Sequence, residues 1–186
     1  MTITRDEASQ ALGEIDAAAG RANEFKTYAH IAPFLMLWGV VWMVCDLLVQ
    51  FEPRWALAWP IGAGLGVLAS IFIGFSLPRD GLTAAERALG WRHMGSWMLV
   101  LVFITALLQV IPITSGREIH SVFGLVFGFL YLGFGLWTGW RMAILGLALI
   151  ALTFIGFYAI GAWYALYMGL VSGGALVLGG LWLRRI

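Results

Sequence analysis

Asp46 is the only acidic side chain inside the apolar stretches that are long enough to be predicted as membrane spans. Burying a carboxylate in lipid is costly unless it is paired or neutral, so an ionisable residue at such a position is a candidate functional site. We expect Asp46 about one helical turn from the outer end of its span, where it could also reach headgroup water or pair with Arg54 or Arg117. A structural anchor and a binding or proton site are therefore both open interpretations.

Polar and aromatic residues of other predicted helices are expected at the depth of Asp46. Trp42 and Trp38 precede it by one and two helical turns, deeper than interfacial tryptophans normally lie. A carboxylate beside indole faces suits a cationic or amphipathic ligand, through charge and cation–π attraction. We therefore predict a ligand-binding site open to the outer side, formed by Asp46, Trp42, Trp38, Gln109, His120, Tyr158 and Tyr164.

The histidines suggest a different chemistry. His30 and His93 begin the first and third predicted spans on one side, so they could face each other across a haem. His120 begins a span on the opposite side and cannot join them. Membrane cytochromes usually place their ligands deeper, so we predict no cofactor and keep haem binding as a third hypothesis.

No catalytic motif accompanies these residues. The sequence contains no G-x-S-x-G elbow, H-E-x-x-H pair, P-loop or dinucleotide-binding glycine motif. Cys45 is the single cysteine, which excludes an internal disulfide and a thiolate metal cluster. We therefore predict that the protein is not an enzyme and has no metal site.

The composition indicates an integral membrane protein. Of 186 residues, 61% are hydrophobic and 11% are charged, whereas about 25% of the residues in a soluble domain are charged. The net charge of +1 gives no reason to expect a nucleic-acid partner. We predict an all-α bundle of six antiparallel transmembrane helices over residues 28–186, with spans at about 28–50, 55–77, 93–113, 119–140, 142–162 and 163–183. The boundary between the last two spans is the weakest, because only Gly161, Trp163 and Tyr164 mark it.

Residues 1–27 precede the first span and differ from it in composition. The first 20 residues are acidic and alanine-rich, so we do not expect a cleavable signal peptide. The spacing of Thr4 and Glu7 predicts a capping box that opens an amphipathic helix over residues 4–26. Its small and apolar residues form a heptad-like seam, Ala8, Ala11, Ile15, Ala18, Ala22 and Phe25. The seam fits a lead-in lying on the membrane surface or on the bundle, or a docking helix for a partner protein.

The distribution of basic residues predicts the orientation. Nine lie on one side of the predicted spans, Arg5, Arg21, Lys26, Arg79, Arg87, Arg92, Arg141, Arg184 and Arg185. Only Arg54 and Arg117 lie on the other side. Short cytoplasmic segments carry the excess of Lys and Arg. We therefore predict a multi-pass protein of the bacterial inner membrane with both termini in the cytoplasm.

Glycines four residues apart recur in the predicted spans, as in Gly62 and Gly66, Gly124 and Gly128, Gly135 and Gly139, and Gly169 and Gly173. Small residues at this spacing let helix backbones approach closely in lipid. The pattern predicts packing inside one bundle, with a homodimer through the glycine-rich helices as the alternative.

Three functions remain open at this point. The first is a small transporter or ligand-binding protein with an outward-facing site around Asp46. The second is a sensory or regulatory membrane subunit that acts through its N-terminal helix and a partner protein. The third is haem binding.

Overall fold

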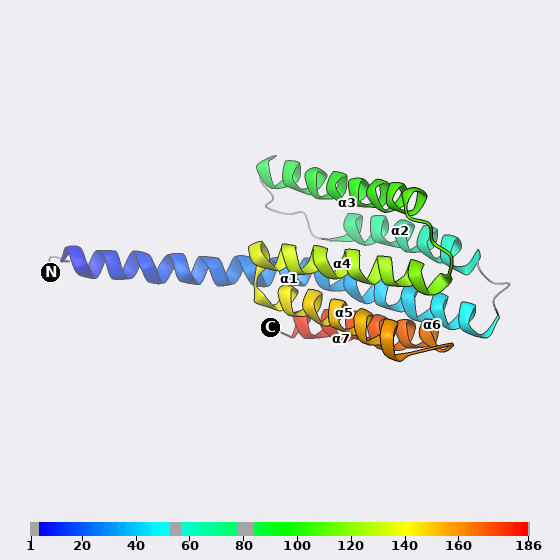
Figure 1. Cartoon of the computed structure of the whole chain (residues 1–186). Helices are drawn as coiled ribbons and strands as arrows, with labels where there is room; N and C mark the ends of the chain where they lie inside the picture. Colours follow the sequence, from blue (N-terminus) through cyan, green and yellow to red (C-terminus); the bar gives the residue numbers. More distant parts are fainter. Residues whose placement is uncertain (1–3, 53–56, 78–83, 186) are drawn as a thin grey trace.

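The computed structural model describes residues 4–52, 57–77 and 84–185, and these residues form helices and short connections without any strand. Figure 1 shows the helices running side by side along one direction, with a long extension of the first helix at one end. The C-terminus lies at the end of the bundle from which this extension projects (Figure 1). The prediction of an all-helical protein is confirmed.

The first helix, α1 (Arg5–Phe51), is 47 residues long and crosses the predicted boundary near residue 27 without a break. It begins with the predicted capping box, in which Thr4 Oγ1 accepts a hydrogen bond from Glu7 N at 3.3 Å and Glu7 Oε2 accepts one from Thr4 N at 2.8 Å. At 1.5 Å per residue the helix is about 70 Å long. The predicted helix over residues 4–26 and the first predicted span therefore belong to one helix, with Pro33 inside it.

The remaining helices complete the bundle. They are α2 (Ala58–Ser76), α3 (Ala84–Val110), α4 (Gly116–Thr138), α5 (Trp140–Ala159), α6 (Tyr164–Tyr167) and α7 (Gly174–Arg184), with a π-helical segment, η2 (Met168–Gly173), between α6 and α7. The second half of α1 packs against α2 on one side and against α6, η2 and α7 on another, and α4 packs along α5. Helix α3 faces α4, with Trp97 stacked on Phe127, and a groove of about 330 Å³ separates part of the two helices.

Five of these helical stretches are long and apolar enough to cross a membrane: α1, α2, α4, α5, and the continuous run Tyr164–Arg184. The last two predicted spans are therefore separate helices. The described side chains of α3 give a shorter apolar helix, Gly95–Val110. Large apolar side chains such as Leu68 and Phe72 point outward from α2, with 64% and 71% of their surface exposed, which is the surface expected of a helix against lipid.

Glycine permits the closest helix contacts within the bundle. A Cβ at Gly146 of α5 would lie 2.2 Å from the backbone nitrogen of Leu132 on α4. A Cβ at Gly173 of η2 would lie 2.9 Å from the carbonyl oxygen of Gly39 on α1. The predicted glycine packing inside the bundle is therefore observed, and it draws α4 to α5 and η2 to α1.

Candidate functional site

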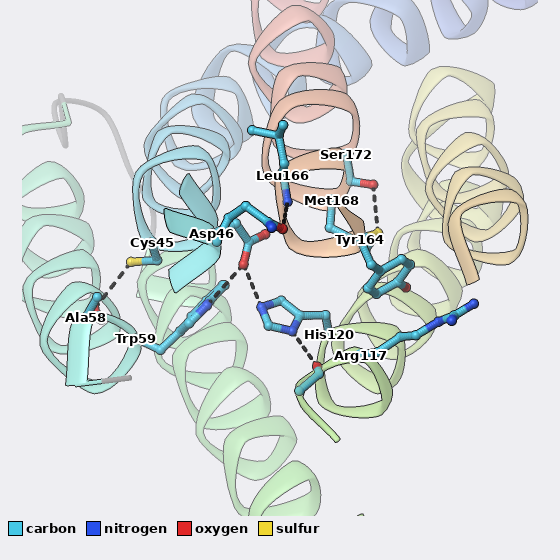
Figure 2. A network of polar contacts seen from close by, with 12 residues as sticks. Cys45, Asp46, Ala58, Trp59, Arg117, His120, Tyr164, Leu166, Met168 and Ser172 are labelled. Carbon is cyan, nitrogen blue, oxygen red and sulfur yellow. Dashed lines mark hydrogen bonds and ion pairs between the residues drawn. The ribbon is translucent and has the colours of Figure 1, made fainter. Parts of the chain in front are cut away.

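Asp46 lies in the last turns of α1 and has no solvent-exposed surface. Its Oδ1 accepts a hydrogen bond from the indole Nε1 of Trp59 on α2, at 3.1 Å. The same oxygen lies 2.6 Å from Nε2 of His120 on α4. Figure 2 shows the three side chains converging from three helices. Residues 74 positions apart in the sequence thus meet at one carboxylate oxygen.

The local packing explains why the carboxylate is enclosed. Gly169 of η2 faces Asp46, and a Cβ there would lie only 2.8 Å from the Cβ of Asp46. The lack of a side chain at Gly169 lets η2 close the side of α1 that Trp59 and His120 leave open. On the neighbouring face, Cys45 donates a hydrogen bond from Sγ to the carbonyl oxygen of Ala58, at 3.3 Å. This contact fixes the start of α2, and with it Trp59, against α1.

The second nitrogen of His120 determines where the ring carries a proton. Nδ1 of His120 lies 2.5 Å from the carbonyl oxygen of Gly116, one turn earlier in α4. A carbonyl oxygen can only accept a hydrogen bond, so Nδ1 carries a hydrogen. Nε2, the nitrogen that faces Asp46, is therefore either the acceptor of a neutral imidazole or the second donor of an imidazolium.

Two atoms of this site lack a complete set of hydrogen bonds. Oδ2 of Asp46 is buried and has no hydrogen-bond partner among the described residues. Nε2 of His120 contacts Oδ1 of Asp46 at ion-pair distance, but no acceptor is aligned with it as in a linear hydrogen bond. A buried polar atom without a partner costs free energy and calls for an explanation, such as a ligand or ion that completes it.

A second polar network lies next to the first on α4 and α6. Ser121 donates from Oγ to the carbonyl oxygen of Arg117 at 2.8 Å, and its Oγ lies 2.6 Å from the hydroxyl of Tyr164. Because the single proton of Ser121 is engaged with the carbonyl, Tyr164 is the donor in the second contact. The guanidinium of Arg117 stacks over Phe157 and Tyr164, with its Cζ 4.7 Å and 5.5 Å from the two ring centres.

Aromatic rings form the wall of the site toward the bundle interior. Trp42 meets Trp59 edge to face, at 6.3 Å between ring centres, and Trp59 makes an edge contact with His120 at 5.6 Å. Phe123 and Phe127 continue the wall along α4. Indole faces next to a carboxylate are suited to cations.

The structure brings together four of the seven predicted residues, Asp46, Trp42, His120 and Tyr164. Trp38 lies further along α1 and donates from Nε1 to Ser70 Oγ at 3.2 Å, which gives this deep indole a structural role. Gln109 is exposed on α3, and Tyr158 is 79% exposed near the end of α5, where it stacks on Phe154. Neither has a recorded contact with Asp46 in the described part of the chain. The carboxylate is also enclosed rather than exposed in an outward cleft.

The partner of Asp46 differs from the sequence expectation. Of the two arginines proposed to pair with it, Arg117 stacks on aromatic rings instead, and Arg54 lies outside the described residues. Trp59 was not among the predicted site residues, but its N–H is bonded to Asp46. The clue in the sequence was its place in the first turn of α2, directly across a tight connection from the end of α1.

Gln50 is a further residue that sequence reasoning missed. Its Nε2 donates to the carbonyl oxygen of Ala162 at 3.1 Å, and its Oε1 accepts from the backbone N–H of Leu166 at 3.2 Å. One turn beyond Asp46, this amide ties the end of α1 to the start of α6. It therefore positions the helix that carries Tyr164.

The described residues show no arrangement of histidines that supports the haem hypothesis. Nδ1 of His30 lies 2.7 Å from the carbonyl oxygen of Lys26, within its own helix. The side chain of His93 lies outside the described part of the structure. Among the residues that are described, no three His, Cys, Asp or Glu side chains gather as a metal site.

Comparison with protein-family models, with curated proteins and with solved structures finds no match. Function is therefore inferred from the geometry of the Asp46 site and from the shape of α1.

Proposed function

We propose that this protein is a multi-pass transporter that binds a small cation at Asp46. The observation that carries the proposal is the second carboxylate oxygen, Oδ2, which is fully buried and has no hydrogen-bond partner among the described residues. A buried carboxylate inside a membrane span is expected to have a partner or a function. A cation at Oδ2 would complete the coordination that Trp59 and His120 begin at Oδ1.

The surroundings of Asp46 favour a positive ligand. The indole of Trp59 is bonded to the carboxylate and that of Trp42 packs against Trp59, and such rings attract cations, quaternary ammonium groups included. The guanidinium of Arg117 is held on Phe157 and Tyr164, so it does not occupy the place of the ligand. Asp46 has no exposed surface. In a transport cycle this enclosed form would stand between two other forms, each of which opens the site to one side of the membrane.

The proposed location is the bacterial inner membrane, with both termini in the cytoplasm. The support is the excess of nine basic residues over two on the side of the termini. The N-terminal extension and the C-terminus lie at the same end of the bundle (Figure 1), as expected if both termini are on one side of the membrane. In this orientation Asp46 lies in the outer third of the membrane.

An uptake assay in proteoliposomes tests the proposal. Radiolabelled Na⁺ and tetramethylammonium serve as a small and a larger probe, and both cross protein-free vesicles slowly. We expect the wild type to take up at least one probe and Asp46→Asn to lose that uptake, because the amide carries no negative charge. Glu14→Gln is the matched control, since it makes the same chemical change at an exposed position of α1. Circular dichroism and size-exclusion profiles show whether each variant folds.

Two results would contradict the proposal. The first is uptake by Asp46→Asn at the wild-type rate. The second is a folded wild type that takes up neither probe above the level of empty vesicles.

The shape of α1 supports a second candidate, a regulatory subunit that binds a protein partner through its N-terminal helix. The described side chains of residues 4–22 are exposed, and apolar Leu12 and Ile15 are each 62% exposed. This stretch continues the axis of α1 beyond the other helices (Figure 1). Deleting residues 2–24 should then abolish co-purification of the partner and leave the bundle folded. An unchanged set of co-purifying proteins would contradict this candidate.

A further inference from the structure

Arg141 lies in the first turn of α5, at the end of the bundle where α7 and the chain end (Figure 1). Its Cζ is 5.5 Å from the ring centre of Trp140 and 5.1 Å from that of Trp182 on α7. The two indoles meet edge to face, with their ring centres 5.8 Å apart. Because indole faces attract cations, these rings hold the guanidinium against two neighbouring helices.

The guanidinium of Arg141 lacks an anionic partner in the described part of the chain. Its Nη1 is buried and donates to no acceptor there, and the ion pair recorded among the described residues is that of Asp46 and His120. The carboxylate of Glu24 lies near the same turn, but its Oε1 is bonded to the hydroxyl of Tyr28 at 2.7 Å. Ring faces attract the charge of Arg141 without offering the lone pair that a buried N–H needs. An acceptor from outside the chain is therefore expected at Nη1.

The surroundings of Arg141 favour a negatively charged acceptor. The residue before α5 is Gly139, so no side chain caps the first N–H groups of this helix, and a helix N-terminus carries a partial positive charge. Arg184 and Arg185 follow Trp182 at the end of α7, and both are exposed. These groups add to the positive charge of Arg141 and make the end of α5 and α7 attractive to an anion.

Apolar surface continues from the two indoles along both helices. Ile144 follows Trp140 by one turn on the same face of α5 and is 46% exposed, and Leu178 precedes Trp182 by one turn on the same face of α7 and is 68% exposed. The two helices touch here, since a Cβ at Gly179 would meet the side chain of Leu145. An acyl chain lying along these faces would cover both apolar side chains, whereas a soluble phosphate would leave them exposed.

We propose that Arg141, with Trp140 and Trp182, binds the phosphate of an anionic phospholipid in the leaflet at this end of the bundle. Nη1 donates to a phosphate oxygen, since guanidinium groups bind phosphates through strong, charge-assisted hydrogen bonds. The indoles lie at the level of the headgroup, where such rings are enriched. In the proposed orientation this leaflet is the cytoplasmic one, which carries anionic lipids. The site requires a bilayer but does not depend on cation binding at Asp46.

Lipid binding measured by native mass spectrometry tests the site. The full-length protein is purified in detergent, freed of bound lipid and titrated with dioctanoyl phosphatidylglycerol, dioctanoyl phosphatidylcholine or inorganic phosphate. We expect the wild type to bind phosphatidylglycerol about tenfold more tightly than either of the others, because it joins a net negative phosphate to acyl chains. Arg141→Gln should lose this preference, and Arg141→Lys, which keeps the charge, should retain part of it. Arg21→Gln, the same change at an exposed position of α1, should behave like the wild type.

Three results would overturn the proposal. The first is equal binding of phosphatidylglycerol and phosphatidylcholine by the wild type, a comparison that does not require any variant to fold. The second is the same preference for phosphatidylglycerol in a folded Arg141→Gln. The third is inorganic phosphate bound as tightly as phosphatidylglycerol, which would assign the site to a soluble ligand instead of a lipid. Asp46→Asn should bind lipid like the wild type, so this test and the uptake assay can fail separately.

Discussion

Two carboxylates at opposite ends of the bundle have different surroundings, and the comparison explains why only one is a candidate site. At the end near the termini, Glu24 of α1 accepts a hydrogen bond from the hydroxyl of Tyr28 at 2.7 Å. Glu24 is partly exposed, so water can complete its coordination. Asp46 has two neighbours at one oxygen and none recorded at the other, and it is fully buried.

The cations at the two ends differ as well. Arg141, at the same end of the bundle, lies against the indoles of Trp140 and Trp182, with its Cζ 5.5 Å and 5.1 Å from the two ring centres. This arrangement suits an anchor at the membrane surface, where indoles and arginines are enriched. Beside Asp46 the neighbouring group is the imidazole of His120, whose Nε2 lies 2.6 Å from Oδ1. The cation at one end of the bundle is therefore held on aromatic rings, whereas the nitrogen at the other end contacts a carboxylate.

The largest change in stability is expected from Gly139→Ala, at the end near the termini. Gly139 has φ of 131°, a conformation that residues with a side chain rarely adopt, and its Cβ would meet Glu24 and Tyr28. We expect a loss of about 3 kcal/mol in unfolding free energy, at the upper end of the cost of such strain. Cation affinity should not change. Thermal unfolding in detergent measures the first quantity and calorimetry the second.

Gly133→Ala provides the matched control for that experiment. Gly133 lies inside α4, the helix that Gly139 caps, and a Cβ there would meet nothing within 4 Å. Alanine should therefore be tolerated or slightly stabilising, as expected in a helix interior. Equal losses at the two glycines would show that neither strain nor contact with Glu24 matters.

A smaller effect, and at the opposite end, is expected from Trp59→Phe. The substitution keeps an aromatic ring but removes the N–H that donates to Oδ1 of Asp46. A hydrogen bond to a charged group contributes about 1.5–3 kcal/mol, so its loss should leave the negative charge of the carboxylate less stabilised and its oxygens less well positioned for a cation. We expect apparent cation affinity to fall about tenfold or more. An unchanged affinity would place the ligand away from Asp46.

The smallest effect is expected from Tyr28→Phe, which removes the hydroxyl bonded to Glu24. Loss of one hydrogen bond to a partly exposed partner should lower the unfolding free energy by about 1 kcal/mol. Uptake and binding of Na⁺ should stay at wild-type values. A loss of cation binding in this variant would remove the distinction between the two ends of the bundle.

Much of this architecture could be predicted from single residues. The apolar runs predicted the helices, the Thr4 and Glu7 spacing predicted the capping box, and the isolated acid predicted Asp46 as the centre of a polar cluster. His120 and Tyr164 were included because the first turns of their helices are expected at the same depth. These predictions depend on helix length and position along the axis, which sequence determines well.

Rotation of each helix about its axis could not be predicted in the same way. Whether Arg117 or His120 faces Asp46 depends on how α4 is turned, and that angle is set by contacts such as Gly124 against Thr153 on α5. Gln109 was included on depth alone, but it is exposed on α3. The continuity of α1 was missed because residues 1–27 and 28–50 differ in composition and were assigned to separate elements.

The uninterrupted α1 also has a mechanical consequence. Its projecting half and Asp46 belong to one rod, so a torque applied to residues 4–22 is transmitted along the axis to the carboxylate. A turn of the rod changes the distance between Asp46 and His120, and a tilt is magnified at the far tip as in a lever. Pro33 leaves one backbone hydrogen bond unmade within this rod. Replacing Pro33 with alanine would restore that hydrogen bond, so it should stiffen the rod between its projecting half and the carboxylate.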